Sequence, residues 1–193
     1  MAKYTKEEIL DLYEGKENGQ LKEAETKLKE LKVYCGDKIK INELNGWVFE
    51  QVVQFCLIEE LGKNNLLPIK EQHRFEYWVS ESDRKKLKIF DLFINNKILI
   101  EVKVNGHQMS KWDDKTIDEK YVAIRKRAEE IEYNFLYISI KEANPKKTGS
   151  KDYRKRTRDL LGEENCFFLD ETEDNWQKFV KRVSEILKQR NNS

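Results

Sequence analysis

The sequence predicts an α/β fold in which helices flank a central mixed β-sheet, made of an antiparallel hairpin core and a parallel strand. The hairpin is indicated by residues 88–104, where apolar and polar residues alternate on both sides of Asn95-Asn96-Lys97. The parallel strand is indicated by residues 134–140, an apolar run that follows a helical pattern over residues 114–133. A strand, helix and strand in this order favour a parallel, right-handed crossover.

The composition limits the class of protein. The 193 residues, 38% of them hydrophobic, suit one domain with a sizeable core. Because 37 basic residues nearly balance 36 acidic ones, binding to nucleic acid would depend on local clusters of charge. The three cysteines are far apart and lack C-x-x-C spacing, which argues against a zinc site or a disulfide framework. No apolar run approaches the ~18 residues of a membrane span, so we expect a cytoplasmic protein without membrane contact.

Residues 1–44 are expected to form a helical N-terminal accessory arm, and residues 45–193 the main domain. Thr5 and Glu8 have the spacing of a capping box, which opens a short helix. A second, highly charged helix is expected over residues 21–31. This arm buries little, so it is either a solvated extension or a contact with a second subunit or with DNA.

The most apolar helix is expected from Asn45 or Gly46 to about Leu61, with Gly62 as its C-cap. Little of its surface is polar, so it should be buried against the sheet. Glu50 is the one charge in its first half. It either favours the positive end of the helix dipole or belongs to a site.

A strand over residues 69–79 and a polar loop over residues 80–86 precede the hairpin. If both arms of the hairpin bury their apolar sets in one core, Asp91 lies directly opposite Glu101. The loop must then have three residues, with an asparagine at positive φ. The pairs expected across the hairpin are Ile94 with Ile98, Leu92 with Ile100, and Phe90 with Val102.

Asp91, Glu101 and Lys103 thus gather on one face. Carboxylates on neighbouring strands, with Cβ atoms roughly 5 Å apart, can hold a hard divalent cation such as Mg²⁺ between them. Lys103 can neutralise the pair at rest, or stabilise charge on a phosphate when metal and substrate are bound. The layout fits metal-assisted hydrolysis of a phosphodiester.

Asp91, nine further residues and then Glu101-Val102-Lys103 resemble the motif of the PD-(D/E)XK nuclease superfamily, although Phe90 stands where that family often has proline. The resemblance implies that Asp91 and Glu101 bind Mg²⁺, or Mn²⁺ in its place, with the Val102 backbone carbonyl as a further ligand. It also implies that Lys103 is the catalytic lysine. Glu50 is the match for the upstream helical acid of the family.

Two further groups of residues are candidates for contact with DNA. The loop after the E-x-K strand lies beside the site and carries polar side chains that can reach phosphates or bases. We expect its histidine to be a surface residue, and a role as general base is the less favoured alternative. A basic run after Pro145 suits contact with the DNA backbone, or is a solvated helix face. The candidates are His107, Gln108, Lys111, Lys151, Arg154, Lys155, Arg156 and Arg158.

A short strand over residues 165–169 and a closing amphipathic helix from Thr172 or Asp174 complete the chain. This order of elements extends the resemblance over residues 45–187 and implies a restriction-endonuclease-like sheet. Within the superfamily the chain looks most like a small type II restriction endonuclease that cuts double-stranded DNA as a homodimer.

Two alternatives stay open. A structure-specific nuclease, such as a Holliday junction resolvase or a repair or phage nuclease, would use the same residues. In a non-catalytic α/β binding domain, Asp91, Glu101 and Lys103 would form only a buried salt-bridged network.

Overall fold

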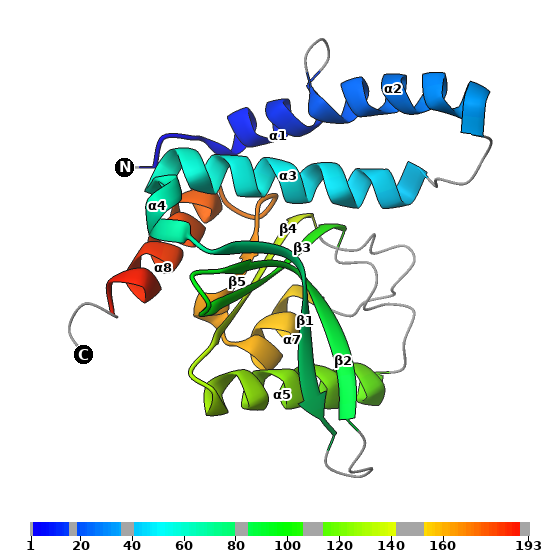
Figure 1. Ribbon diagram of the computed structural model, residues 1–193. Coiled ribbons are helices and arrows are strands. Elements are labelled where there is room, and N and C mark those ends of the chain that lie inside the picture. Colours follow the sequence, from blue (N-terminus) through cyan, green and yellow to red (C-terminus); the bar gives the residue numbers. More distant parts are fainter. Residues whose placement is uncertain are drawn as a thin grey trace.

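The computed structural model describes residues 2–15, 19–35, 41–79, 85–105, 114–141 and 153–189. The helices and strands are coloured along the sequence in Figure 1. The helices are α1 (Lys6–Glu14), α2 (Gln20–Cys35), α3 (Ile41–Leu61), α4 (Lys63–Leu66), α5 (Asp114–Glu130), α7 (Tyr153–Leu161) and α8 (Asn175–Lys188), with a 3₁₀ turn at Glu163–Asn165. The strands are β1 (Ile69–Trp78), β2 (Lys85–Ile94), β3 (Ile98–Asn105), β4 (Asn134–Lys141) and β5 (Cys166–Phe168).

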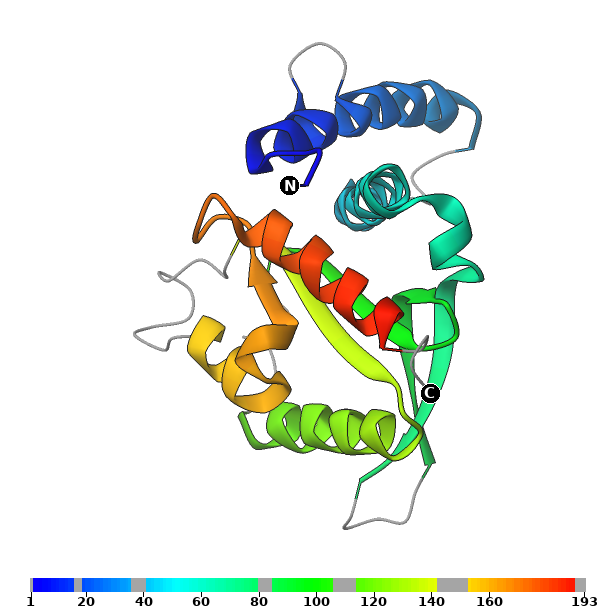
Figure 2. The ribbon, with the colours of Figure 1, turned by 90° about the vertical axis from the view of Figure 1, so that its left-hand side faces the viewer.

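The five strands form one mixed sheet in the order β1-β2-β3-β4-β5. The first three strands are antiparallel, and β3, β4 and β5 are parallel. Helices α3 and α8 cover one face, whereas α5 and α7 cover the other (Figure 2). Both faces are therefore buried, and the mixed, helix-flanked sheet expected from the sequence is confirmed.

The paired part of the hairpin has the predicted register. Leu92 lies opposite Ile100, and Ile94 lies opposite Ile98, but the predicted pair of Phe90 with Val102 is not part of the ladder. The turn has three residues, with φ of 52° at Asn95 and 50° at Asn96, and the Lys97 amide donates to the Ile94 carbonyl at 3.0 Å. The paired part of the β2–β3 ladder ends at Leu92 and Ile100, so Asp91 and Glu101 occupy the next step, where the strands separate.

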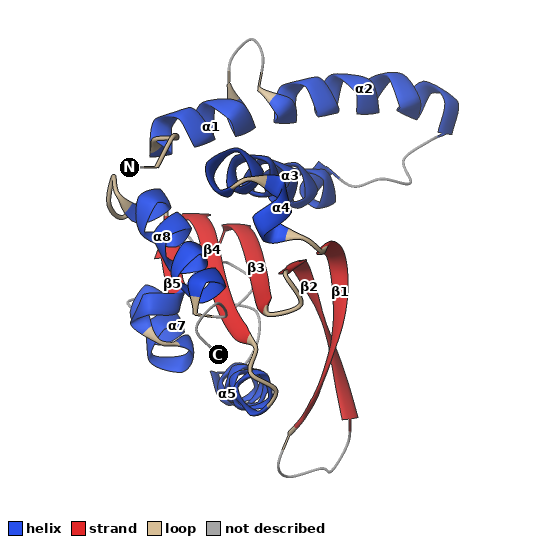
Figure 3. Ribbon diagram, turned by 60° about the vertical axis from the view of Figure 1, so that its left-hand side comes forward, coloured by secondary structure: helices blue, strands red, loops and turns tan. Residues whose placement is uncertain are grey.

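The expectation that Phe90 and Leu92 share a core is wrong. Leu92 is buried in the core beneath α3 and α8, but Phe90 is buried in the core beneath α5. Residues two apart normally face the same side of a sheet. The β1–β2 ribbon therefore turns over between these two residues, at Asp91 and its neighbour Gln72, whose φ is +50°. The ribbon continues beyond this point at the edge of the sheet (Figure 3).

The N-terminal arm packs more closely than its sequence suggested. The capping box at Thr5 and Glu8 is present. Ile9 and Tyr13 of α1 are fully buried, and the Tyr13 ring meets the Phe49 ring of α3 edge-on at 5.4 Å between centroids. The predicted boundary after residue 44 falls inside α3, so the chain has no break in secondary structure there.

Other elements differ from the sequence prediction at their ends. β2 begins at Lys85, inside the predicted loop, and the described part of the basic run, from Tyr153 onward, lies in a helix, α7. None of the helices in the described parts of the chain is both long and apolar enough to cross a membrane.

Candidate active site

The four predicted catalytic side chains are brought close to one another where β2 and β3 separate. Glu50 comes from α3, Asp91 from β2, and Glu101 and Lys103 from β3. Asp91 is 7% exposed and Glu101 only 2%, so both carboxyl groups are removed from bulk water. Such groups need partners, because an unpaired buried charge is strongly unfavourable.

Lys103 provides the central partner. Its ammonium nitrogen lies 2.8 Å from Glu101 Oε1, 3.1 Å from Asp91 Oδ2 and 3.0 Å from the carbonyl oxygen of Val102. The Val102 amide donates a hydrogen bond of 2.7 Å to the same Asp91 oxygen. Three oxygen atoms from three residues thus converge on a single positive charge.

Lys88 is a partner that the sequence reasoning missed. Its ammonium lies 2.5 Å from Glu101 Oε2, on the side away from Lys103, and donates to the carbonyl of Ile89 at 2.8 Å. The alternation along β2 placed Lys88 on the same face as Phe90, and that face turned out to be the α5 side. No local signal in the sequence reports this change of face.

The charges of the cluster are unequal. Burial raises the pKa of Glu101, but Lys103 and Lys88 outweigh burial and hold the pKa below its ordinary value. Burial and the charge of Glu101 raise the pKa of Asp91, against the opposing effects of Lys103 and the Val102 amide. Burial lowers the pKa of Lys103, but the two carboxylates outweigh it and raise the pKa above the ordinary value. Lys103 is therefore charged near neutral pH.

Glu50 has the most unusual protonation in the site. Burial first, and then the negative charge of Asp91, raise its pKa to about 7, while Lys103 acts in the opposite direction. Gln72 Nε2 donates a hydrogen bond to Glu50 Oε2 at 3.2 Å. Glu50 is consequently a carboxyl group that can take up or release a proton near neutral pH.

The donor set fits a hard divalent cation. Asp91, Glu101 and the Val102 carbonyl already surround one cationic nitrogen within 3.1 Å, and oxygen ligands of this kind suit Mg²⁺. Among the described residues, no three side chains of the His, Cys, Asp and Glu types are close enough to form a metal site by themselves. The set therefore consists of two carboxylates and a main-chain oxygen, and the Lys103 ammonium competes with a metal for them.

The residues proposed from the sequence to contact DNA are only partly visible. His107, Gln108, Lys111 and Lys151 lie outside the described residues. In α7, Arg154 forms a salt bridge of 2.8 Å to Asp170, and Arg158 forms a bidentate pair with Glu171. Both arginines thus pair with acids within the fold. Lys155 is exposed and Arg156 is half-buried, and both also interact with other parts of the chain.

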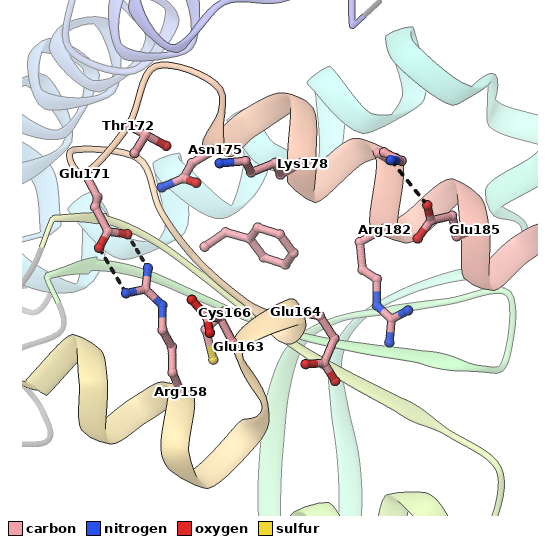
Figure 4. A pocket seen from close by; sticks show the side chains of 12 residues that line it. Arg158, Glu163, Glu164, Cys166, Glu171, Thr172, Asn175, Lys178, Arg182 and Glu185 are labelled. Carbon is pink, nitrogen blue, oxygen red and sulfur yellow. Dashed lines mark hydrogen bonds and ion pairs between the residues drawn. The ribbon is translucent and has the colours of Figure 1, made fainter.

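A hollow of about 500 Å³ lies at the β5 edge of the sheet, between α7 and α8 (Figure 4). Arg158 with Glu171 lies at one end, and Arg182 of α8, which donates to Asn165 at 3.2 Å, lies toward the other. Arg158 pairs with Glu171 and Lys181 with Glu185 inside the hollow, and β4 separates this edge from the strands that carry Asp91 and Glu101. The hollow therefore contributes no group to the cluster of Asp91, Glu101 and Lys103.

Comparison with known proteins agrees with this geometry. The family model of the PD-(D/E)XK nuclease superfamily matches residues 31–134, which is more than half of the chain and includes all four clustered residues. Neither the curated proteins nor the solved structures contain a significant match. The matched region, the mixed sheet and the clustered acid and lysine side chains together show that this chain belongs to the PD-(D/E)XK nuclease superfamily.

Proposed function

We propose that the protein is a Mg²⁺-dependent endonuclease that hydrolyses phosphodiester bonds of double-stranded DNA. The observation that carries this proposal is the convergence of Asp91, Glu101 and the Val102 carbonyl on one cationic point. These three residues would hold the metal. When bound, the metal would polarise the phosphate and lower the pKa of an attacking water.

Lys103 and Glu50 have complementary roles in this proposal. The pKa of Lys103 is raised above its ordinary value by the two carboxylates, so its ammonium is charged near neutral pH and would stabilise negative charge that develops on the phosphate. Glu50, with a pKa raised to about 7, accepts the proton of the attacking water. A general base with a pKa near the working pH combines availability with proton affinity.

The surroundings of the cluster favour a polyanionic substrate. Lys88 and Lys103 both contact Glu101. Lys120 of α5 is also near these lysines: burial first, and then the charges of Lys88 and Lys103, lower its pKa, while Glu101 acts in the opposite direction. The ammonium groups of Lys88, Lys103 and Lys120 offset the negative charge of the two buried carboxylates, Asp91 and Glu101. They therefore lower the repulsion that these carboxylates would exert on a phosphodiester chain.

The narrower part of the proposal is a type II restriction activity, in which a homodimer cleaves a palindromic sequence. Lys155 and Arg156 of α7 remain candidates for contacts with the DNA backbone. Purified protein incubated in Mg²⁺ with a long duplex of diverse sequence should produce discrete fragments, and gel filtration with light scattering should give twice the monomer mass of 23.2 kDa.

Four experiments connect cleavage to the site. Asp91→Ala should abolish cleavage without unfolding the protein, and EDTA should do the same for the wild type. Lys103→Ala should slow cleavage by about 10²–10³-fold, the usual cost of losing one group that stabilises transition-state charge. Lys181→Ala, which removes an exposed lysine of α8, is the matched control and should cleave normally.

The result that rejects the nuclease proposal is cleavage at the wild-type rate in Lys103→Ala and Asp91→Ala, or no cleavage of any duplex. Cleavage of four-way junctions in place of linear duplex would instead identify a structure-specific nuclease built on the same residues.

A further inference from the structure

The irregular point of β1 lies beside the catalytic cluster. Gln72 has φ of +50° inside a ten-residue strand, a conformation that a residue with a Cβ atom adopts at a cost. In the described parts of the chain, the other residues with a side chain and a positive φ are Asn95, Asn96 and Glu132, and all three lie in turns.

Gln72 faces the first carboxylate of the motif. The register of β1 and β2 pairs Glu71 with Leu92 and His73 with Phe90, which places Gln72 opposite Asp91. This is the position at which the otherwise continuous β1–β2 ladder is unpaired, and at which the ribbon turns over. On its other side Asp91 accepts a hydrogen bond of 2.7 Å from the Val102 amide, which lies beyond the end of the β2–β3 ladder.

The identity of the side chain is informative. Glycine or asparagine would meet the backbone requirement at lower cost. Glutamine is less suited to this φ, but its longer side chain brings Nε2 within 3.2 Å of Glu50 Oε2. Since Gln72 is exposed, this hydrogen bond competes with water and adds little to folding stability.

We propose that Gln72 is a positioning residue for Glu50, an inference that rests on the nuclease function proposed above. Asp91 and Glu50 repel each other when both are ionised, so Glu50 needs a donor to keep it turned toward the reacting centre. An amide supplies that donor without a charge. The amide therefore holds the Glu50 carboxylate without neutralising its charge. A lysine at the same place would neutralise it.

The test is a double-mutant cycle between Gln72 and Glu50, measured as steady-state cleavage in Mg²⁺. Gln72→Asn keeps an amide that suits a positive φ but is one methylene too short to reach Glu50. We expect it to lower kcat by about 10- to 100-fold, the cost of a misplaced catalytic group, with KM changed less than about twofold and an unchanged or higher Tm. In a Glu50→Gln background, the same substitution should cause no further loss.

Glu71→Gln, the adjacent exposed position with an ordinary backbone, is the matched control and should leave kcat unchanged. The inference is overturned if Gln72→Asn lowers kcat equally in both backgrounds, because Gln72 would then act independently of Glu50. It is also overturned if the whole loss appears in KM, which would assign Gln72 to direct contact with DNA.

A second readout does not depend on cleavage. In ¹H–¹⁵N spectra, the side-chain amide signals of Gln72 are identified by their absence from Gln72→Gly, and they should shift in Glu50→Ala. Unshifted signals would refute the hydrogen bond. If the wild type has no nuclease activity but these signals shift as expected, the proposed function is rejected and the contact between Gln72 and Glu50 still stands.

Discussion

Replacing Glu50 with glutamine tests the electrostatics of the cluster through stability. The pKa of Glu50 is about 7 in the folded protein, against an ordinary value of 4.5. Because folding raises the pKa, the protonated form is favoured in the native state. The folded protein is therefore most stable, as far as Glu50 is concerned, below pH 4.5, and this stability is lost as the pH rises to about 7.

The size of the effect follows from the shift. A difference of about 2.5 pKa units corresponds to about 3.4 kcal/mol, and solvent screening at a half-buried site reduces this to about 1–2 kcal/mol. Glu50→Gln removes the titration and keeps an acceptor for Gln72. We therefore compare the unfolding free energy of Glu50→Gln minus that of the wild type at two pH values. This difference should be about 1–2 kcal/mol larger at pH 8 than at pH 5, which corresponds to about 2–8 °C in Tm.

The assay is urea unfolding of both proteins at pH 5 and pH 8, in EDTA so that no metal contributes. Glu59→Gln, which changes a carboxylate near the other end of α3, is the control. If the difference in unfolding free energy between wild type and Glu50→Gln is the same at both pH values, Glu50 has an ordinary environment and the reasoning fails.

Three further predictions concern other parts of the molecule. Lys103→Met leaves two buried carboxylates without their shared cation, so this variant should lose about 3–5 kcal/mol of stability in EDTA and recover much of it in Mg²⁺. A melting temperature that does not change when Mg²⁺ is added would contradict the metal assignment. Ile100→Asp places an unpaired charge at a fully buried position and should destabilise the fold by about 3 kcal/mol or more, and a variant that melts like the wild type would mean that the face assignment is wrong. Arg158→Ala should cost about 1 kcal/mol through its pair with Glu171 while the salt dependence of DNA binding stays unchanged, whereas a slope reduced by about 1 would place this arginine on DNA.

Local patterns in the sequence determined the architecture and the candidate motif. Alternation on both arms of the hairpin sets the pairs Leu92–Ile100 and Ile94–Ile98, because a one-residue slip would expose every apolar side chain of one arm. That register in turn required a three-residue turn with asparagine at positive φ, as observed. The capping box at Thr5 and the parallel β3–α5–β4 unit are likewise encoded by spacing and order.

The expectations that proved wrong concern long-range geometry. Strict alternation placed Phe90 with Leu92, but the ribbon turns over at Asp91, and this change of face brings Lys88 to Glu101. A positive φ at a glutamine has no signature in residue type, unlike the asparagines of the turn. The burial of α1 also escaped prediction, since Ile9 and Tyr13 are a small apolar set whose partners lie about 40 residues away.

The sequence by itself determined the order of the elements, the hairpin register and the identity of the two carboxylates and the lysine, because each depends on spacing within a few residues. Only the tertiary structure decided which charges meet. The tertiary structure brings three oxygens to the Lys103 ammonium and pairs two arginines of α7 with acids. It also raises the pKa of Glu50 through burial and the charge of Asp91. Burial and the distance between groups far apart in the chain set these energies, and neither quantity can be read from local spacing.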